Sequence, residues 1–149
     1  MNEVPASSGS VIVERDLPHP PDKVWRALTQ PHLIVEWLAD IDFQPVPGHQ
    51  FAVRIDPQPG RSFVFECEVT AIEHGRVLAY SWNTPADGNR PGLATIVTWR
   101  LTPVPGGTRL RMEQSGFRAD QPHFYHGASM GWPRFIARLE ALLARPESG

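Results

Sequence analysis

Hydrophobic residues in the middle of the chain recur at every second position, which is the repeat of a strand with one buried face. The alternation appears in five segments, residues 51–55, 63–69, 78–82, 97–101 and 110–114. Turn sequences such as Pro105-Gly106-Gly107 separate these segments. Sequential strands joined by short turns predict an antiparallel meander. One face of this sheet is apolar and the other is charged, so one face is expected to cover a core.

The N-terminal part of the chain predicts one further strand and two short helices. Residues 11–17 are rich in β-branched side chains, which favours a strand. Pro21 is placed where the first turn of a helix tolerates a missing N–H group, and Pro31 is placed to end that helix and begin the next. Leu33, Ile34 and Trp37 then fall on one helical face.

The C-terminal part predicts one long amphipathic helix. From Trp132 to Leu143 the apolar residues repeat at intervals of three and four, with arginines opposite them. Pro133 is expected to kink or restart this helix, because proline removes a backbone hydrogen bond. The long helix is the only large element available to cover the apolar face of the sheet. It is too narrow to fill a curved sheet, so a cavity is expected between them.

Composition limits the class of protein without identifying it. The chain has 149 residues, which favours one domain, predicted over residues 11–145 after a disordered leader at residues 1–10. The net charge of −2 and the dispersed basic residues argue against nucleic-acid binding. The leader lacks the features of a signal peptide, and no apolar run approaches the length of a membrane span. A cytoplasmic protein with no membrane insertion is therefore expected.

Two motifs near the C terminus have a functional and a structural interpretation. Residues 127–131 match the G-x-S-x-G pattern around an esterase serine, Ser129, but the preceding segment is predicted helical rather than a strand. Small residues that let a helix approach the sheet are the favoured interpretation. His123 and His126 share a helical face, yet no third ligand accompanies them, so no metal site is predicted.

Other reactive side chains also favour structural roles. The single cysteine, Cys67, falls on the apolar side of its strand, where a thiol is usually inert packing. Asp40 and Asp42 follow the second helix, and no convincing acid–base pair is found for catalysis. No glycine-rich phosphate loop is present, and no cofactor is predicted.

Several sequence pieces, taken in order, resemble the START-related (SRPBCC) superfamily. The resemblance is carried by residues 21–29, 31–37, 68–69, 76–78, 80–82, 98–101, 106–110, 114–117 and 131–132, with Leu139 and Leu142 after them. The nearest branch is the one homologous to the activator of the heat-shock-protein-90 ATPase. This resemblance implies an α+β helix-grip fold, with a curved antiparallel sheet of six to seven strands around the long C-terminal helix. Pro133, directly after Gly131-Trp132, departs from the family pattern.

The resemblance also implies a function, which is binding of a small hydrophobic molecule of lipid or polyketide type between sheet and helix. A co-chaperone that contacts a chaperone or another protein is one alternative, and a cavity enzyme such as a cyclase or dehydratase is another. Fold analogy alone does not decide among them.

Pocket composition, together with the resemblance, selects candidate ligand-binding residues. A pocket combines aromatic walls with few polar groups, and Tyr80 and Gln114 would be those groups, with His126 at the mouth. The candidates are Trp37, Phe65, Tyr80, Trp82, Val97, Trp99, Met112, Gln114, His126 and Met130. Plain core packing would account for the same aromatic residues.

Overall fold

The computed structural model describes residues 9–86, 88, 89 and 91–146 of the chain. Within them, the elements follow the order β1, α1, α2, β2 to β6, α3. Their bounds are β1 Gly9–Leu17, α1 Pro21–Thr29, α2 Pro31–Trp37, β2 Gln50–Gln58, β3 Arg61–Glu73, β4 Val77–Asn83, β5 Ala94–Val104, β6 Gly107–Phe117 and α3 Pro122–Ala144.

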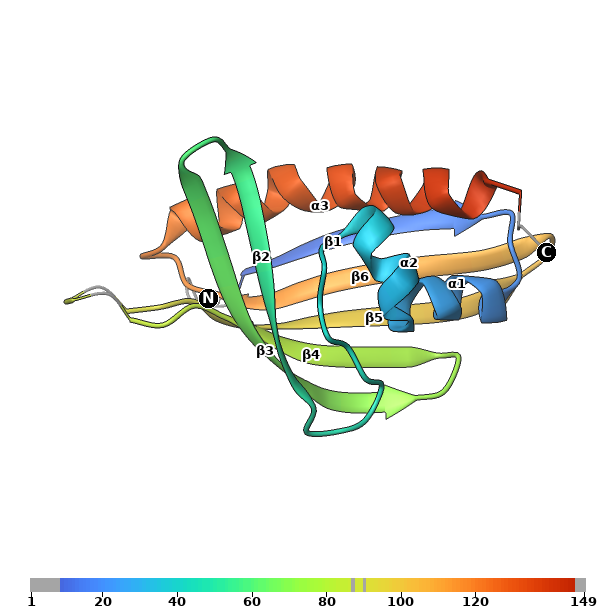
Figure 1. Ribbon diagram of the computed structural model, residues 1–149, viewed down its shortest axis with the longest axis horizontal. Helices are drawn as coiled ribbons and strands as arrows, with labels where there is room; N and C mark the ends of the chain where they lie inside the picture. The colour runs from blue at the N-terminus through green and yellow to red at the C-terminus, as the bar shows by residue number, and fades with distance from the viewer. Residues whose placement is uncertain (1–8, 87, 90, 147–149) are drawn as a thin grey trace, which may run out of the picture.

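The strands form one antiparallel sheet in the order β1-β6-β5-β4-β3-β2. Strands β2 to β6 form a meander. Strand β1 pairs with β6 and is the edge of the sheet opposite β2. The sheet curves strongly, α3 lies along its concave side, and the β2–β3 hairpin turns away from the other strands (Figure 1). The predicted α+β helix-grip fold is therefore confirmed, with six strands.

The two prolines that were predicted to begin helices do so. Pro21 and Pro31 each occupy the first turn of their helix, where no intrahelical N–H bond is lost. The indole of Trp37 ties the two helices together, since its Nε1 donates a 2.8 Å hydrogen bond to the carbonyl of Ala27. Trp37 is thereby fixed in the core, where its ring meets Trp99 edge-on.

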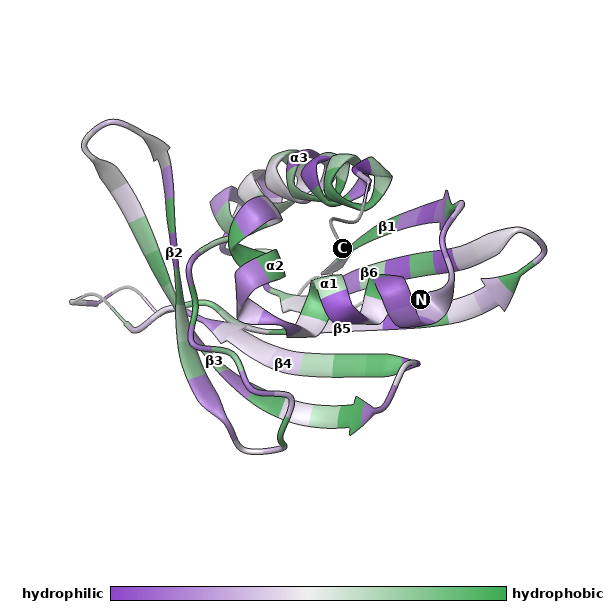
Figure 2. Cartoon of the chain, turned by 45° about the vertical axis from the view of Figure 1, so that its right-hand side comes forward, coloured by the Kyte–Doolittle hydropathy of each residue, from purple (hydrophilic) through white to green (hydrophobic). Residues whose placement is uncertain are grey.

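Helix α3 is held against the sheet mainly by its second half. Its buried residues are Trp132, Ile136, Leu139 and Leu143, at helical spacing. The helix continues through Pro133, so the restart that the sequence predicted does not occur. Figure 2 shows hydrophobic residues interspersed with hydrophilic ones along α3.

The remaining expectations concern the chain ends and membranes. Strand β1 begins at Gly9, which places the last two residues of the predicted leader in the sheet, while residues 1–8 lie outside the described part. In the part of the chain that the structure describes, no helix combines the length and the apolar character needed to cross a membrane.

Candidate functional site

The space between α3 and the middle of the sheet is spanned by side chains. Within the described residues, α3 has Cα atoms within 8 Å of those in β1 and β6, but none within 8 Å of those in β2 to β5. In Figure 2 the β2–β3 hairpin likewise stands apart from α3. Large side chains are required to fill such a separation without leaving a void.

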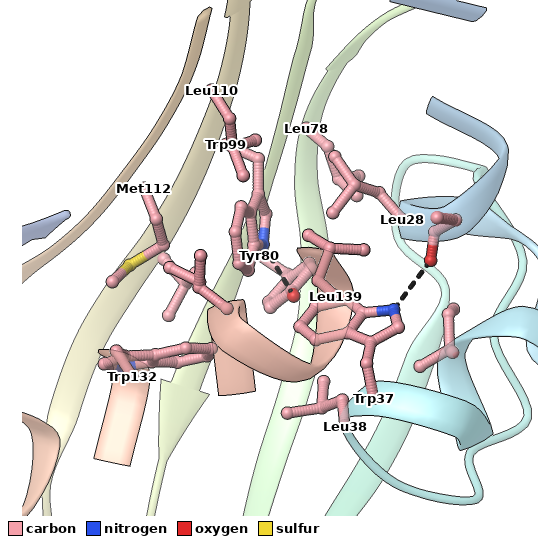
Figure 3. Packing of buried hydrophobic residues seen from close by; sticks show 14 of the residues in the cluster. Leu28, Trp37, Leu38, Leu78, Tyr80, Trp99, Leu110, Met112, Trp132 and Leu139 are labelled. Carbon is pink, nitrogen blue, oxygen red and sulfur yellow. Dashed lines mark hydrogen bonds between the residues drawn. The ribbon is translucent and has the colours of Figure 1, made fainter. Parts of the chain in front are cut away.

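Aromatic rings fill this space. The ring of Trp132, from α3, lies 5.2 Å from that of Trp82 and 5.7 Å from that of Trp99, measured between centroids. Trp99 also meets Trp37 at 5.6 Å in an edge-to-face arrangement. Figure 3 shows Trp37 and Trp132 on either side of Leu139. Edge-to-face pairs of this kind add to the stability that apolar burial provides.

Gln114 is the centre of a buried hydrogen-bond chain in the same region. Its side chain is 1% exposed. Its Oε1 accepts a 2.7 Å bond from Trp132 Nε1, and its Nε2 donates a 3.0 Å bond to Thr95 Oγ1. The Thr95 hydroxyl in turn donates to the carbonyl of Trp82 at 2.6 Å. The buried amide thus finds its partners within the protein, as burial of a polar group requires.

The second predicted polar group, Tyr80, is also paired inside the fold. Trp99 Nε1 donates a 2.8 Å hydrogen bond to the Tyr80 hydroxyl oxygen (Figure 3). Burial raises the pKa of Tyr80 above its usual range, and the bond from Trp99 offsets part of that rise. Tyr80 is therefore a neutral hydroxyl at physiological pH.

The aromatic row continues onto the outer part of the β2–β3 hairpin. Phe65 stacks on Trp82 with 4.8 Å between ring centroids and 30° between planes, and Phe63 stacks on Phe65. Phe65 is partly buried, and Phe63 is 36% exposed. Buried rings deep in the fold are thus continuous with rings that reach solvent on the hairpin.

The structure places the ten candidate residues in three environments. The fully buried group consists of Trp37, Tyr80, Trp82, Val97, Trp99, Met112 and Gln114. Phe65 is partly buried at the edge of this group. His126 is exposed and Met130 is 52% exposed, so both lie on the surface of α3 rather than among the buried rings.

Two cavities of the described structure are lined by none of the ten candidate residues. One, of about 520 Å³, is formed on β2, β3 and β4 by polar residues that include Glu66, Glu68 and Ser81. The other, of about 450 Å³, lies where α1 and α2 meet the C-terminal end of α3. Neither cavity is lined by Trp82, Trp99 or Gln114.

The remaining motifs occupy structural or exposed positions. Ser129 lies inside α3 and not at a strand-to-helix turn, which is the context that an esterase serine needs. His123, His126, Asp40 and Asp42 are all exposed. No three His, Cys, Asp or Glu side chains in the described ranges are grouped closely enough to hold a metal ion.

Sequence reasoning did not assign Thr95 or Trp132 to the polar chain. Thr95 precedes Val97 by two residues, so extending the strand alternation one step would have placed it on the buried face. Trp132 was predicted to be in the apolar face of the long helix, but its hydrogen bond to Gln114 has no signal in the sequence. The partly exposed Phe63 was predicted only as part of a strand.

Burial of Cys67 and Tyr80 predicts a loss of stability at alkaline pH. Burial, with a smaller contribution from Glu66, raises the pKa of Cys67 from 9.0 to about 12. Above the ordinary pKa the unfolded chain releases a proton that the folded chain keeps, so stability falls as pH rises until the folded pKa is reached. We expect Cys67 to contribute a loss of about 1–2 kcal/mol between pH ~8 and pH ~10.5. Urea unfolding at both pH values measures this loss in the free energy of unfolding.

Cys67→Ala provides the control for this prediction. The variant removes the thiol, so its stability should fall less steeply with pH than that of the unchanged protein, whatever the cost of the substitution at neutral pH. Equal slopes for the two proteins would show that the buried thiol does not cause the alkaline loss.

Comparison with known protein families agrees with the observed fold. Residues 18–144 match the family described as "Activator of Hsp90 ATPase homolog 1-like protein". None of the curated proteins matches the chain.

Several solved structures resemble the whole chain. Protein MLL2253 from Mesorhizobium loti is 51% identical, with a TM-score of 0.86 over 94% of this chain and 100% of that chain. Protein NE0264 from Nitrosomonas europaea shares the fold at 24% identity, with a TM-score of 0.73 over 90% and 93% of the two chains. DynU16, described as a protein in the dynemicin biosynthetic locus, is 26% identical, with a TM-score of 0.71 over 90% of this chain and 46% of that chain. The resemblance inferred from the sequence is confirmed, and the chain belongs to the family of activator of Hsp90 ATPase homolog 1-like proteins.

Proposed function

We propose that the protein binds a small, neutral, hydrophobic molecule between the β2–β3 hairpin and α3. The observation that carries the proposal is the aromatic row from Trp82 through Phe65 to Phe63, which begins in the core and ends at solvent. A row of this kind offers an apolar molecule a surface on which to stack. Ligand sites are typically concave, aromatic and supplied with few polar groups.

The attachment of α3 supports entry of the ligand on this side. All buried residues of the helix lie at or after Trp132. The part of α3 before Trp132 contributes only partly buried side chains, among them Phe124 and Ala128, to the core. Regions with few buried apolar contacts open at lower free-energy cost than a core. The first half of α3 and the hairpin therefore can separate without disrupting the packing around Ile136 and Leu139.

The charge of the interior supports a neutral ligand. No charged side chain is buried in the described part of the chain. A charged ligand placed among Trp82, Trp132 and Phe65 would lose its hydration without gaining a counter-ion, which is costly. Tyr80 and Gln114 already have partners within the protein, so ligand binding rests on apolar contact rather than on polar recognition.

Family relationship gives separate support of a general kind. DynU16, at 26% identity, is described as belonging to a biosynthetic locus, where proteins meet small organic molecules. That description applies to DynU16. For this chain, the proposal that it binds a small organic molecule rests on the aromatic row.

A neutral fluorescent probe, N-phenyl-1-naphthylamine, tests the proposal. We expect saturable binding, with energy transfer from tryptophan to the probe because Trp82 and Trp132 adjoin the site. Phe65→Ala should weaken binding about tenfold, which corresponds to about 1.4 kcal/mol of lost contact. Fluorescence titration of both proteins gives the two dissociation constants.

Val64→Ala is the matched control. Val64 neighbours Phe65 on the same strand but is 48% exposed on the opposite face of the sheet. Its truncation should leave probe affinity unchanged. Equal losses in Phe65→Ala and Val64→Ala, or a probe signal that rises without saturation, would contradict the proposed site.

A further inference from the structure

A cleft at the other end of α3 combines basic and apolar side chains. It has a volume of about 450 Å³ and is formed by α1, α2 and the C-terminal end of α3. Lys23, Arg26 and Arg145 line it together with apolar residues that include Leu33 and Leu142. We call it the α1–α2–α3 cleft. Its volume falls within the range of about 300–1,000 Å³ that is typical of small-molecule sites.

The cleft is held open by contacts that join its walls. Lys23, on α1, donates a 2.8 Å hydrogen bond from Nζ to the carbonyl of Leu143, near the end of α3. Arg145 pairs with Glu36 of α2 at 3.3 Å. These contacts tie both short helices to the same end of α3. In Figure 1, α2 lies directly below α3, and α1 lies farther below it, in front of the strands.

The charge within the cleft is one-sided. None of the lining residues in the described structure is an aspartate or glutamate. Asp22, which pairs with Arg26, and Glu36, which pairs with Arg145, are not among the lining residues. Both of these ion pairs are solvent-exposed, and such pairs contribute about 0–1 kcal/mol, so exchanging either pair for a pair with a second anion costs little.

From this arrangement we propose that the α1–α2–α3 cleft binds a small organic anion with a short apolar tail. The guanidinium groups of Arg26 and Arg145 pair with its oxyanion, and Leu33 and Leu142 contact its tail. Guanidinium groups match the geometry of carboxylates and phosphates, which share this oxyanion chemistry. The site is separate from the aromatic row. It binds an anion, whereas the aromatic row binds a neutral molecule.

Octanoate, octyl phosphate and octanol share one tail and differ in the head group, so they test the proposal together. Ala27, Gln30 and Leu143 line the cleft. Titration of the ¹⁵N-labelled protein, followed by NMR, should show saturable shifts of their amide signals with either anion. Octanol should bind about tenfold more weakly, because charge-assisted hydrogen bonds to the arginines are lost. Added salt should weaken binding of the anions but not of octanol. The tighter of the two anions identifies the preferred head group.

Charge-neutralising variants locate the site. Arg26→Gln and Arg145→Gln should each weaken octanoate binding about fivefold and leave octanol unaffected, because each removes one charged partner of the anion. Arg134→Gln is the matched control, since Arg134 is exposed on α3 outside the cleft.

Three results would overturn the proposal: equal affinity for octanoate and octanol, no saturable shift with either anion, or shifts confined to the indole signals of Trp82 and Trp132. The last result would place octanoate in the aromatic interior and would leave the cleft without a ligand. Binding of the neutral naphthylamine probe is measured independently, so failure at one site is distinguishable from failure at the other.

Discussion

Trp132→Ala is expected to remove about 3–5 kcal/mol from the free energy of unfolding. Trp132 is 3% exposed and is the side chain of α3 that reaches both Trp82 and Trp99. Since no Cα atom of α3 lies within 8 Å of those of β2 to β5, relaxation of the surroundings should fill only part of the space that the indole leaves. Stability of a domain is typically about 5–15 kcal/mol, so the variant would be close to unfolding. Urea unfolding measures the loss.

Met130→Ala is the control on the same helix. Met130 is 52% exposed, so its truncation should change stability by less than about 0.5 kcal/mol. If Trp132→Ala cost no more than Met130→Ala, α3 would not be held to the sheet through this indole, and the account of the interior would be wrong.

Gln114→Leu is expected to destabilise the fold by about 1–3 kcal/mol, although leucine is the more hydrophobic residue. The substitution removes the oxygen that accepts the hydrogen bond from Trp132 Nε1. It also removes the N–H group that donates to Thr95 Oγ1. An unsatisfied buried polar group costs its full desolvation penalty. Urea unfolding of the variant and the unchanged protein measures the effect.

A double-mutant cycle with Trp132→Phe separates the hydrogen bond from packing. Phenylalanine keeps an aromatic ring and removes the N–H donor, so Gln114→Leu should cost less in the Trp132→Phe background than alone. The expected coupling is about 1 kcal/mol. Additive effects would show that the 2.7 Å contact between Trp132 and Gln114 contributes nothing to stability.

Much of the fold could be predicted because each element has a local signal. The alternation of residues 63–69 and 97–101 identified strands, and the prolines at positions 21 and 31 identified helix starts. Pro133 was the exception, because tertiary packing by Trp132 and Ile136 holds α3 as one helix despite the missing hydrogen bond.

The details of the site depend on contacts between distant segments, which the sequence does not encode locally. Gln114 was predicted to point inward, and it is buried. Its partners, Thr95 and Trp132, are 19 and 18 residues away along the chain. His126 was expected at the cavity mouth, and the structure leaves it exposed on α3. A helical repeat defines which residues share a face, and tertiary packing decides which way that face points.

The same reasoning explains why the α1–α2–α3 cleft was not predicted. Arg26 and Arg145 belong to opposite ends of the chain: Arg26 is a half-buried residue of α1, and Arg145 directly follows α3. Only the packing of α2 and α1 against the end of α3 brings them to one cavity.

The central claim is that an apolar ligand binds between the β2–β3 hairpin and α3. Intermolecular nuclear Overhauser effects between N-phenyl-1-naphthylamine and the protein test it most directly, because they locate the ligand atom by atom. The account predicts contacts to the rings of Phe65 and Trp82 and to the indole of Trp132. Contacts found only to residues of the outer sheet face, such as Ile12 and Ile96, would contradict it.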